Sequence, residues 1–173
     1  MKKYELTEET IKVKGKTLYR IKALKDFSDV EIGDLGGYVE SEDNLSQEGN
    51  CWIYNAAKVY DNARIYDKAM VCDNAQVYGN ALVYENAKIF NNAKVYGYAN
   101  VLGYAYICDN AEIIYNNAKV YDTAKVFVDS RIFIYGKARI CGNIKIYTQY
   151  ELDQYLTNKR LINAINNLWR NMN

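Results

Sequence analysis

Apolar and polar positions follow a six-residue period from Leu45 to Tyr147. A clear copy is Val83-Tyr84-Glu85-Asn86-Ala87-Lys88, in which an aliphatic residue is followed four places later by alanine. A period of six fits neither an α-helix nor a plain strand, but it is typical of short parallel strands joined by tight corners. The aliphatic positions are Ile53, Val59, Ile65, Val71, Val77, Val83, Ile89, Val95, Val101, Ile107, Ile113, Val120, Val126, Ile132, Ile140 and Ile146.

The period also predicts which side chains point inward. Val59 sits in the middle of its strand and faces the core, so Lys58 and Tyr60 must face outward. Alanine fits the inner corner after each turn, and Asp, Asn and Gly tolerate the left-handed backbone that a corner needs. We therefore expect Val95→Asp to unfold the middle of the stack and Lys94→Asp to be nearly neutral.

This pattern resembles the left-handed parallel β-helix of the hexapeptide-repeat superfamily, in which three hexads form one triangular coil. The expected fold class is an all-β solenoid, a left-handed parallel β-helix with an N-terminal β-hairpin cap and a C-terminal α-helix. The expected division is a capping segment over residues 1–43, the β-helix over 44–147 and an amphipathic helix over 148–173.

The first 43 residues lie outside the repeat. The stretch Thr10 to Ile21 alternates apolar and polar residues around Lys14-Gly15-Lys16, which predicts a β-hairpin. Phe27 to Gly37 is expected to be a loop. The hairpin would cap the open end of the β-helix. Together with Gly33-Asp34-Leu35-Gly36-Gly37-Tyr38, this opening resembles small hexapeptide-repeat proteins carried by bacteriophages and prophages.

One face of the triangle is less polar than the other two. It is the face centred on Ile53, Val71, Ile89, Ile107 and Val126. An apolar strip on a protein surface usually marks a covered surface, and the cover here would be the C-terminal helix or another subunit. The apolar residues expected to point outward on it are Trp52, Tyr54, Met70, Cys72, Phe90, Tyr106, Cys108 and Phe127.

The register breaks twice, by one residue between Ile113 and Val120 and by two residues between Ile132 and Ile140. Both breaks are expected at the same corner of consecutive coils, where an insertion can aim side chains at a partner or ligand. The alternative is an insertion that the surface merely tolerates. The candidate binding residues near this corner are Tyr96, Tyr98, Tyr115, Asn116, Tyr135 and Lys137.

After Tyr147 the pattern becomes helical. Thr148 can cap the helix, and an apolar stripe follows at helical spacing. We expect this stripe to pack on the β-helix or on a second copy, and to contribute to a homo-oligomer, a dimer or trimer. The stripe comprises Leu161, Ile162, Ile165, Leu168 and Trp169.

The composition argues against several kinds of chemistry. The chain has no histidine. In the hexapeptide-repeat superfamily that it resembles, the acyltransferases use a histidine as general base, and the carbonic-anhydrase-like members bind zinc through three histidines. No CxxC pair, phosphate-binding loop or dinucleotide fingerprint is present. We therefore expect no enzyme activity, no metal and no cofactor. The net charge of +1 argues against nucleic-acid binding.

No apolar stretch is long enough to span a membrane, and the first residues lack a secretion signal. The expected location is the cytoplasm, that of the host cell if the gene is carried by a phage.

Three functions remain open. The tyrosine-rich surface and the phage-like opening favour a non-catalytic binding protein that inhibits a host defence protein by direct contact. An alternative is an oligomeric protein that sequesters a nucleotide or saccharide, stacked on tyrosine. A second alternative is a structural or assembly scaffold. Stacked tyrosines also stabilise a strand ladder by themselves.

Overall fold

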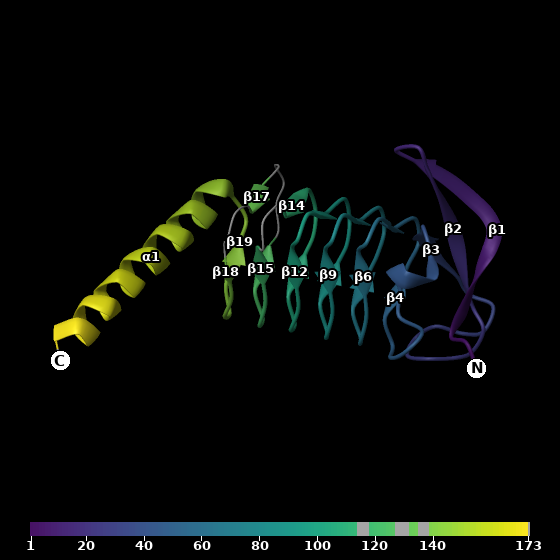
Figure 1. Cartoon of the computed structure of the whole chain (residues 1–173), viewed down its shortest axis with the longest axis horizontal. Coiled ribbons are helices and arrows are strands. Elements are labelled where there is room, and N and C mark those ends of the chain that lie inside the picture. Colours follow the sequence, from purple (N-terminus) through teal and green to yellow (C-terminus); the bar gives the residue numbers. More distant parts are fainter. Residues whose placement is uncertain (114–117, 127–131, 135–138, 173) are drawn as a thin grey trace.

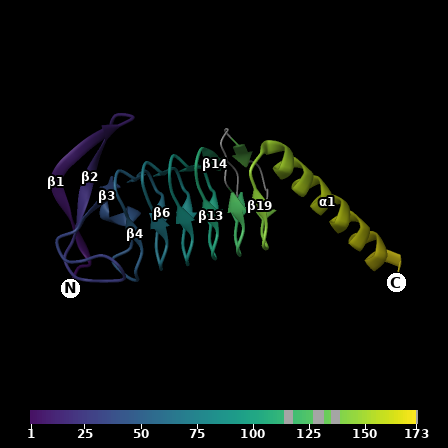
Figure 2. The same ribbon diagram turned by 180° about the vertical axis from the view of Figure 1, so that it is seen from behind.

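The computed structural model describes residues 1–113, 118–126, 132–134 and 139–172, and it shows a parallel β-solenoid (Figure 1). Coils stack along the long axis of the molecule, with a long hairpin at the N-terminal end and the helix α1 (Gln149–Met172) at the other. The view from behind shows the same order (Figure 2). The predicted fold class, with its hairpin and its terminal helix, is confirmed.

Three sheets form the sides of the solenoid. The first has the order β1-β2-β3-β5-β8-β11-β14-β17, the second β18-β15-β12-β9-β6, and the third β19-β16-β13-β10-β7-β4. The strands of the first sheet are β1 (Tyr4–Val13), β2 (Lys16–Ala23), β3 (Leu35–Val39), β5 (Lys58–Val59), β8 (Gln76–Val77), β11 (Lys94–Val95), β14 (Ala111–Ile113) and β17 (Ile132–Ile134). Those of the second are β6 (Arg64–Ile65), β9 (Leu82–Val83), β12 (Asn100–Val101), β15 (Lys119–Val120) and β18 (Arg139–Ile140). Those of the third are β4 (Trp52–Ile53), β7 (Met70–Val71), β10 (Lys88–Ile89), β13 (Tyr106–Ile107), β16 (Lys125–Val126) and β19 (Lys145–Ile146).

The hexad register explains the core. Val59 pairs with Val77 in the next coil, 18 residues on, so three hexads make one turn. Both valines are fully buried, and so is Ala63 at the corner between β5 and β6. The core is therefore a set of aliphatic columns along the strands with alanine columns along the corners, as the period predicts.

Acidic residues at the corners tie consecutive coils together. Asp61, Asp67 and Asp73 all have positive φ, between 58° and 61°. The Asp61 Oδ2 atom accepts a hydrogen bond from the Gly79 N–H at 3.0 Å. Asp73 Oδ2 accepts one from the backbone N–H 18 residues further on at 3.1 Å. Aspartate thus satisfies a backbone donor at a corner whose conformation it also tolerates.

The N-terminal hairpin extends the first sheet beyond the coils. β1 and β2 pair antiparallel around Lys14 and Gly15, whose φ angles of 48° and 82° suit a type I′ turn. β3 pairs antiparallel with β2 and parallel with β5, so it joins the hairpin to the solenoid. The predicted hairpin is confirmed, but residues 35–37 belong to a strand and not to the expected loop.

The predicted position of the second register break is wrong. Ile113 pairs with Ile134, and Ala111 pairs with Ile132. Ile134 is buried with 1% of its surface exposed. The two extra residues therefore precede Ile134, between β16 and β17, and the two breaks lie at different corners. Because Ile132 and Ile134 are two residues apart, strand alternation alone could not distinguish them.

The helix α1 is anchored at its first turns. The Glu151 carboxylate accepts hydrogen bonds from the backbone N–H groups of Tyr147 and Thr148 at 2.7 and 3.0 Å. Thr148 Oγ1 accepts one from the Glu151 N–H at 3.2 Å, which completes a capping box. Leu152 is buried as part of the core. The predicted Thr148 cap is confirmed, and the helix then leads away from the coils (Figure 1).

Within the described part of the chain, no helix combines the length and apolar character that crossing a bilayer requires.

Candidate functional site

A column of stacked tyrosines runs along the first sheet. The ring centroids of Tyr60 and Tyr78 are 4.9 Å apart, and those of Tyr78 and Tyr96 are 4.6 Å apart. The tip of the hairpin reaches this column, because Lys14 Nζ lies 4.3 Å from the Tyr78 ring centroid. Tyr60, expected to face outward, is only 1% exposed. The outward column is thus partly covered by the capping hairpin.

Only two of the six predicted binding residues can be placed. Tyr96 ends the described stack and is half-buried, whereas Tyr98 follows at the corner and is 57% exposed. The prediction that both register breaks lie at the same corner is wrong, since the two breaks are at different corners. The remaining candidates, Tyr115, Asn116, Tyr135 and Lys137, lie outside the described residues.

The N-terminal segment covers the beginning of the apolar third face. Tyr4 and Phe27 contact Trp52 edge to face, with ring centroids 6.1 and 5.4 Å apart, and Trp52 is 1% exposed. The Tyr54 hydroxyl donates a 2.8 Å hydrogen bond to Asp29. Burial, followed by this contact, raises the pKa of Tyr54. The sequence predicted that the C-terminal helix or another subunit would cover this face. At its beginning, the N-terminal segment covers it instead.

Further along this face the apolar side chains are only half covered. Phe90 and Tyr106 contact each other edge to face, with centroids 6.0 Å apart. Cys108, expected to point outward, is buried, and its thiol donates to the Val126 carbonyl oxygen at 3.5 Å. Met70 and Cys72 are half-buried, and Phe127 lies outside the described residues. The helix does not cover these coils, because it leads away from them (Figure 2).

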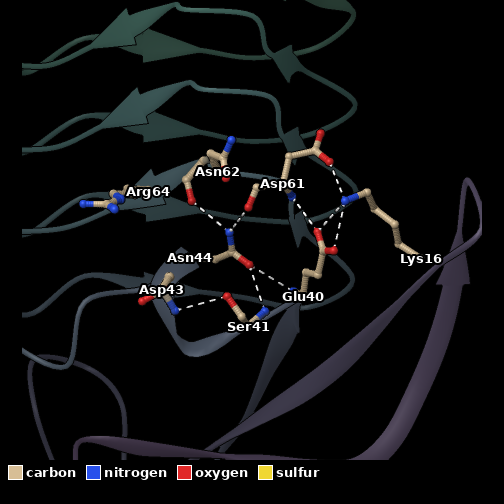
Figure 3. Close-up of a pocket in the computed structure, with 9 residues that line it drawn as sticks. Lys16, Glu40, Ser41, Asp43, Asn44, Asp61, Asn62 and Arg64 are labelled. Atoms are coloured by element: carbon tan, nitrogen blue, oxygen red, sulfur yellow. Dashed lines mark hydrogen bonds and ion pairs between the residues drawn. The ribbon is translucent and has the colours of Figure 1, made fainter.

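The structure reveals a polar cluster that sequence reasoning missed. Lys16 Nζ lies 2.9 Å from Glu40 Oε1 and 2.7 Å from Asp61 Oδ1 (Figure 3). The contacts with Asp61 and then Glu40 raise the pKa of Lys16. Glu40 Oε2 also accepts from the Asp61 N–H at 2.8 Å. The sequence contained no signal for this cluster, because its members come from the hairpin, the end of β3 and a corner.

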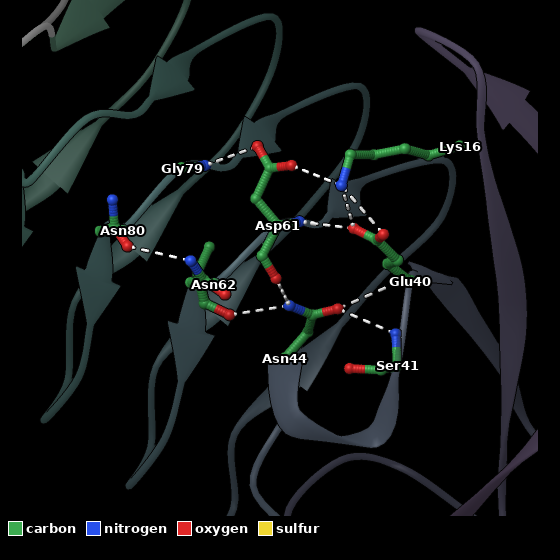
Figure 4. Close-up of polar contacts among 9 residues, drawn as sticks. Lys16, Glu40, Ser41, Asn44, Asp61, Asn62, Gly79 and Asn80 are labelled. Carbon is green, nitrogen blue, oxygen red and sulfur yellow. Dashed lines mark hydrogen bonds and ion pairs between the residues drawn. The ribbon is translucent and has the colours of Figure 1, made fainter.

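Asn44 joins that cluster to the coils. It ends the short 3-10 helix η1 (Glu42–Asn44) and is fully buried. Its Nδ2 atom donates to the carbonyl oxygens of Asp61 and Ala63, both at 2.9 Å (Figure 4). Its Oδ1 atom accepts from the N–H groups of Glu40 and Ser41 at 3.1 and 3.0 Å. One side chain thus binds four backbone groups where η1 meets the corner between β5 and β6.

Two cavities flank Arg64 beside this closure. One has a volume of about 230 Å³ and is lined by the polar cluster, and the other has a volume of about 520 Å³. Both include Asp43 and Arg64, and the larger also includes Tyr66, which stacks on Tyr84 at 4.8 Å. The Arg64 side chain points away from the cluster (Figure 3) and forms no ion pair among the described residues. A cation without an ion pair and an aromatic ring that line the same cavity suit a ligand that carries an anionic group and a planar ring.

Comparisons with known proteins point to the same kind of repeat. A family model described as the YdcK β-solenoid repeat matches residues 75–88. The uncharacterized acetyltransferase YdcK of Escherichia coli (strain K12) is 43% identical over 63 residues. The match covers 32% of this chain and 19% of that relative, so the chain spans about a fifth of the relative's length.

The name of this relative contradicts one expectation. The chain was expected to have no enzyme activity because it has no histidine, yet the similar protein is named an acetyltransferase. Histidine is one of several side chains that transfer protons, and cysteine attacks carbonyl groups directly. The absence of histidine alone is therefore no sufficient argument against activity.

Proposed function

We propose that this protein acts by direct contact with another protein, through the tyrosine-lined side of its solenoid. The observation that carries the proposal is the exposure of Tyr98, at 57%, two residues after the stacked ring of Tyr96. Tyrosine supplies a large contact area at low cost in side-chain entropy, and it is enriched where protein interfaces concentrate their binding energy. The stacked column beneath provides a rigid support for such a contact.

The finer form of the proposal is that this contact inhibits the partner, and that the partner is a host defence protein. Support comes from the opening of the chain, around Gly36-Gly37-Tyr38, which resembles proteins carried by phages and prophages. An inhibitor of this kind needs only to occupy a surface.

The experiment is capture of a partner from a bacterial lysate with tagged protein, followed by native mass spectrometry. Tyr98→Ala should remove a stoichiometric partner. Tyr104→Ala is the matched control, because Tyr104 is 61% exposed at a different corner. Equal retention by both variants would contradict the proposed surface. Purified partner should then lose its own activity when wild-type protein is added, and keep it when Tyr98→Ala is added.

The cavities around Arg64 favour a second binding function, sequestration of a nucleotide or saccharide. Volumes of several hundred Å³ are typical of small-molecule sites, and here the larger cavity is about 520 Å³. Protein heated after purification should release a small molecule. Equilibrium dialysis with adenosine monophosphate as the probe should show binding that Arg64→Met weakens and Arg139→Met does not.

The similarity to a protein named an acetyltransferase supports a third candidate, acyl transfer. Purified protein should then consume acetyl-coenzyme A faster when a mixture of amine and hydroxyl acceptors is present. Consumption equal to that of buffer with every acceptor would count against this candidate.

A further inference from the structure

Cys141 lies at the junction between the last coils and the terminal helix. It directly follows β18, and its thiol faces the first turns of α1. Lys159 Nζ is 2.7 Å from Cys141 Sγ. Tyr155 and Lys159 are four residues apart in α1, so both lie on the same side of the helix. The last coil and the terminal helix thus place an ammonium group on a thiol.

Tyr155 holds this pair in place. Its hydroxyl oxygen accepts hydrogen bonds from the Cys141 N–H at 3.2 Å and from Lys159 Nζ at 2.9 Å. The same hydroxyl donates to the Cys141 carbonyl oxygen at 3.2 Å. Because it contacts both the backbone of the cysteine and the lysine ammonium, the distance between thiol and ammonium is fixed by more than one contact.

The surroundings favour the thiolate. Burial raises the pKa of Cys141, but hydrogen bonds with Lys159, Tyr121 and Tyr155 outweigh it, and the net pKa lies below the usual value. The other charged neighbours are Arg139, which lies over the Tyr121 ring, and Asp122, which accepts a hydrogen bond from the N–H of residue 142.

The other three cysteines differ. Burial raises the pKa of Cys72 to about 11 and that of Cys108 to about 12. Cys51 also contacts a lysine, Lys3 at 3.3 Å, but it is fully buried, and burial raises its pKa. All four thiols are free. Cys141 alone among them combines partial exposure with stabilisation of the thiolate, which is the environment of reactive cysteines.

We propose that Cys141 is a nucleophile that takes an acyl group from a thioester donor. The thiolate attacks the thioester carbonyl carbon, a new S–C bond forms, and the donor's C–S bond breaks. The donor leaves as a thiolate and takes up a proton from solvent, so no oxidant or reductant is needed. The Lys159 ammonium, next to the sulfur, is within reach of the oxygen that becomes negative during the attack.

This inference deepens the acyl-transfer candidate by naming the group that would carry the acyl chain. Its test measures acylation of the protein itself and needs no external acceptor. It can therefore succeed where no acceptor is found, and it can fail while some other residue transfers acyl groups.

The experiment is incubation of the full chain with acetyl-coenzyme A near neutral pH, followed by intact-mass measurement and peptide mapping. One acetyl group should appear on Cys141, and hydroxylamine should remove it. Cys141→Ser should abolish this acetylation. Cys72→Ser, in which a different half-buried thiol is removed, is the control and should leave the acetylation unchanged.

Alkylation by iodoacetamide tests the role of the lysine separately. A change of one unit in thiol pKa alters the alkylation rate roughly threefold, because the lower nucleophilicity of a weaker base partly offsets the larger thiolate fraction. Lys159→Met should slow alkylation of Cys141 and shift its pH profile upward, and Lys159→Arg should restore part of both. Faster labelling of Cys72 than Cys141 in the wild-type protein would overturn the proposal, as would acetylation that persists in Cys141→Ser.

Discussion

Asn44 Nδ2 lies 2.9 Å from the carbonyl oxygen of Ala63, and this contact ties the end of η1 to the inner corner of the first coil. The amide is fully buried and saturated, because it donates to two carbonyl groups and accepts from two N–H groups. This side chain therefore satisfies four backbone groups at the N-terminal end of the solenoid.

Replacing Asn44 should therefore destabilise the protein. Asn44→Ala leaves several buried backbone groups without partners, at about 1–3 kcal/mol for such a group, so urea unfolding should show a loss of at least about 2 kcal/mol. Asn44→Asp should be worse at neutral pH, since a carboxylate would face two carbonyl oxygens. Asn62→Ala is the control, because Asn62 makes only an exposed contact with Asn80. Equal midpoints for Asn44→Ala and Asn62→Ala would refute this account.

Gly37 is required for a close approach of two backbones. A Cβ atom there would lie 2.5 Å from the Ala57 carbonyl oxygen and 2.5 Å from Ile53 Cγ2. We expect Gly37→Ala to cost roughly 1–3 kcal/mol or more, because the strand β3 must shift. Gly33→Ala is the comparison: its Cβ meets nothing within 4 Å, and only its φ of +94° is unfavourable. The measurement is again the urea midpoint, and a larger loss for Gly33→Ala would show that the close approach is unimportant.

Much of the fold could be predicted because one signal recurs in every coil. The inward position of Val59 and the small residue at Ala63 follow from strand alternation and the six-residue period, and both are buried as expected. Strand alternation cannot distinguish two aliphatic residues that are two positions apart, so the period predicts Ile132 at the core position that Ile134 occupies. The period shows which side chains point outward from the coil, but it does not show whether another segment covers them. The burial of Trp52 beneath Tyr4 and Phe27 therefore could not be predicted.

The candidate sites were harder to predict because they join segments distant in the sequence. The cluster of Lys16, Glu40 and Asp61 depends on where the hairpin tip meets a corner. The contact between Cys141 and Lys159 depends on the direction in which the helix leaves the last coil. Neither relationship repeats along the chain, so no period could indicate it.

Val95→Asp remains a strong test of the register. Val95 is fully buried, and a carboxylate in that column has no partner, so we expect the free energy of unfolding to fall by more than about 4 kcal/mol.

The structure shows that Lys94→Asp is not a suitable control for this test. Lys94 forms a 3.0 Å ion pair with the largely buried Glu112, so Lys94→Asp would place two carboxylates together and should not be neutral. Lys119→Asp is the better control, because Lys119 is exposed and stands beside Arg139 in the ladder. Similar melting temperatures for Val95→Asp and Lys119→Asp would rule out the register.

The tyrosine column predicts a loss of stability in alkali. Burial and then the charge of Asp61 raise the pKa of Tyr60 from 10.0 to about 12. The folded state therefore keeps a proton that the unfolded state loses, and this contribution is complete below pH 10 and declines as the pH rises through about 12. Tyr60→Phe should flatten the fall in unfolding free energy across this window. Tyr104→Phe, at an exposed ring, should leave the curve unchanged, and a slope that Tyr60→Phe does not alter would contradict the assignment.

The prediction that the terminal helix mediates self-association can now be tested with single residues. Leu152 and Leu161 both belong to α1, but Leu152 is 1% exposed against the end of the core and Leu161 is 62% exposed. The side chains of Ile165, Leu168 and Trp169 are not among those described. Leu161→Asp should lower the mass in solution, measured by light scattering, because it removes apolar surface from a contact between copies. Leu152→Ala should instead lower the melting temperature and leave the mass in solution unchanged, since it leaves a cavity that costs roughly 2–5 kcal/mol. If Leu161→Asp and a chain ending at Tyr147 both keep the wild-type multiple of 20.0 kDa, the helix has no part in assembly.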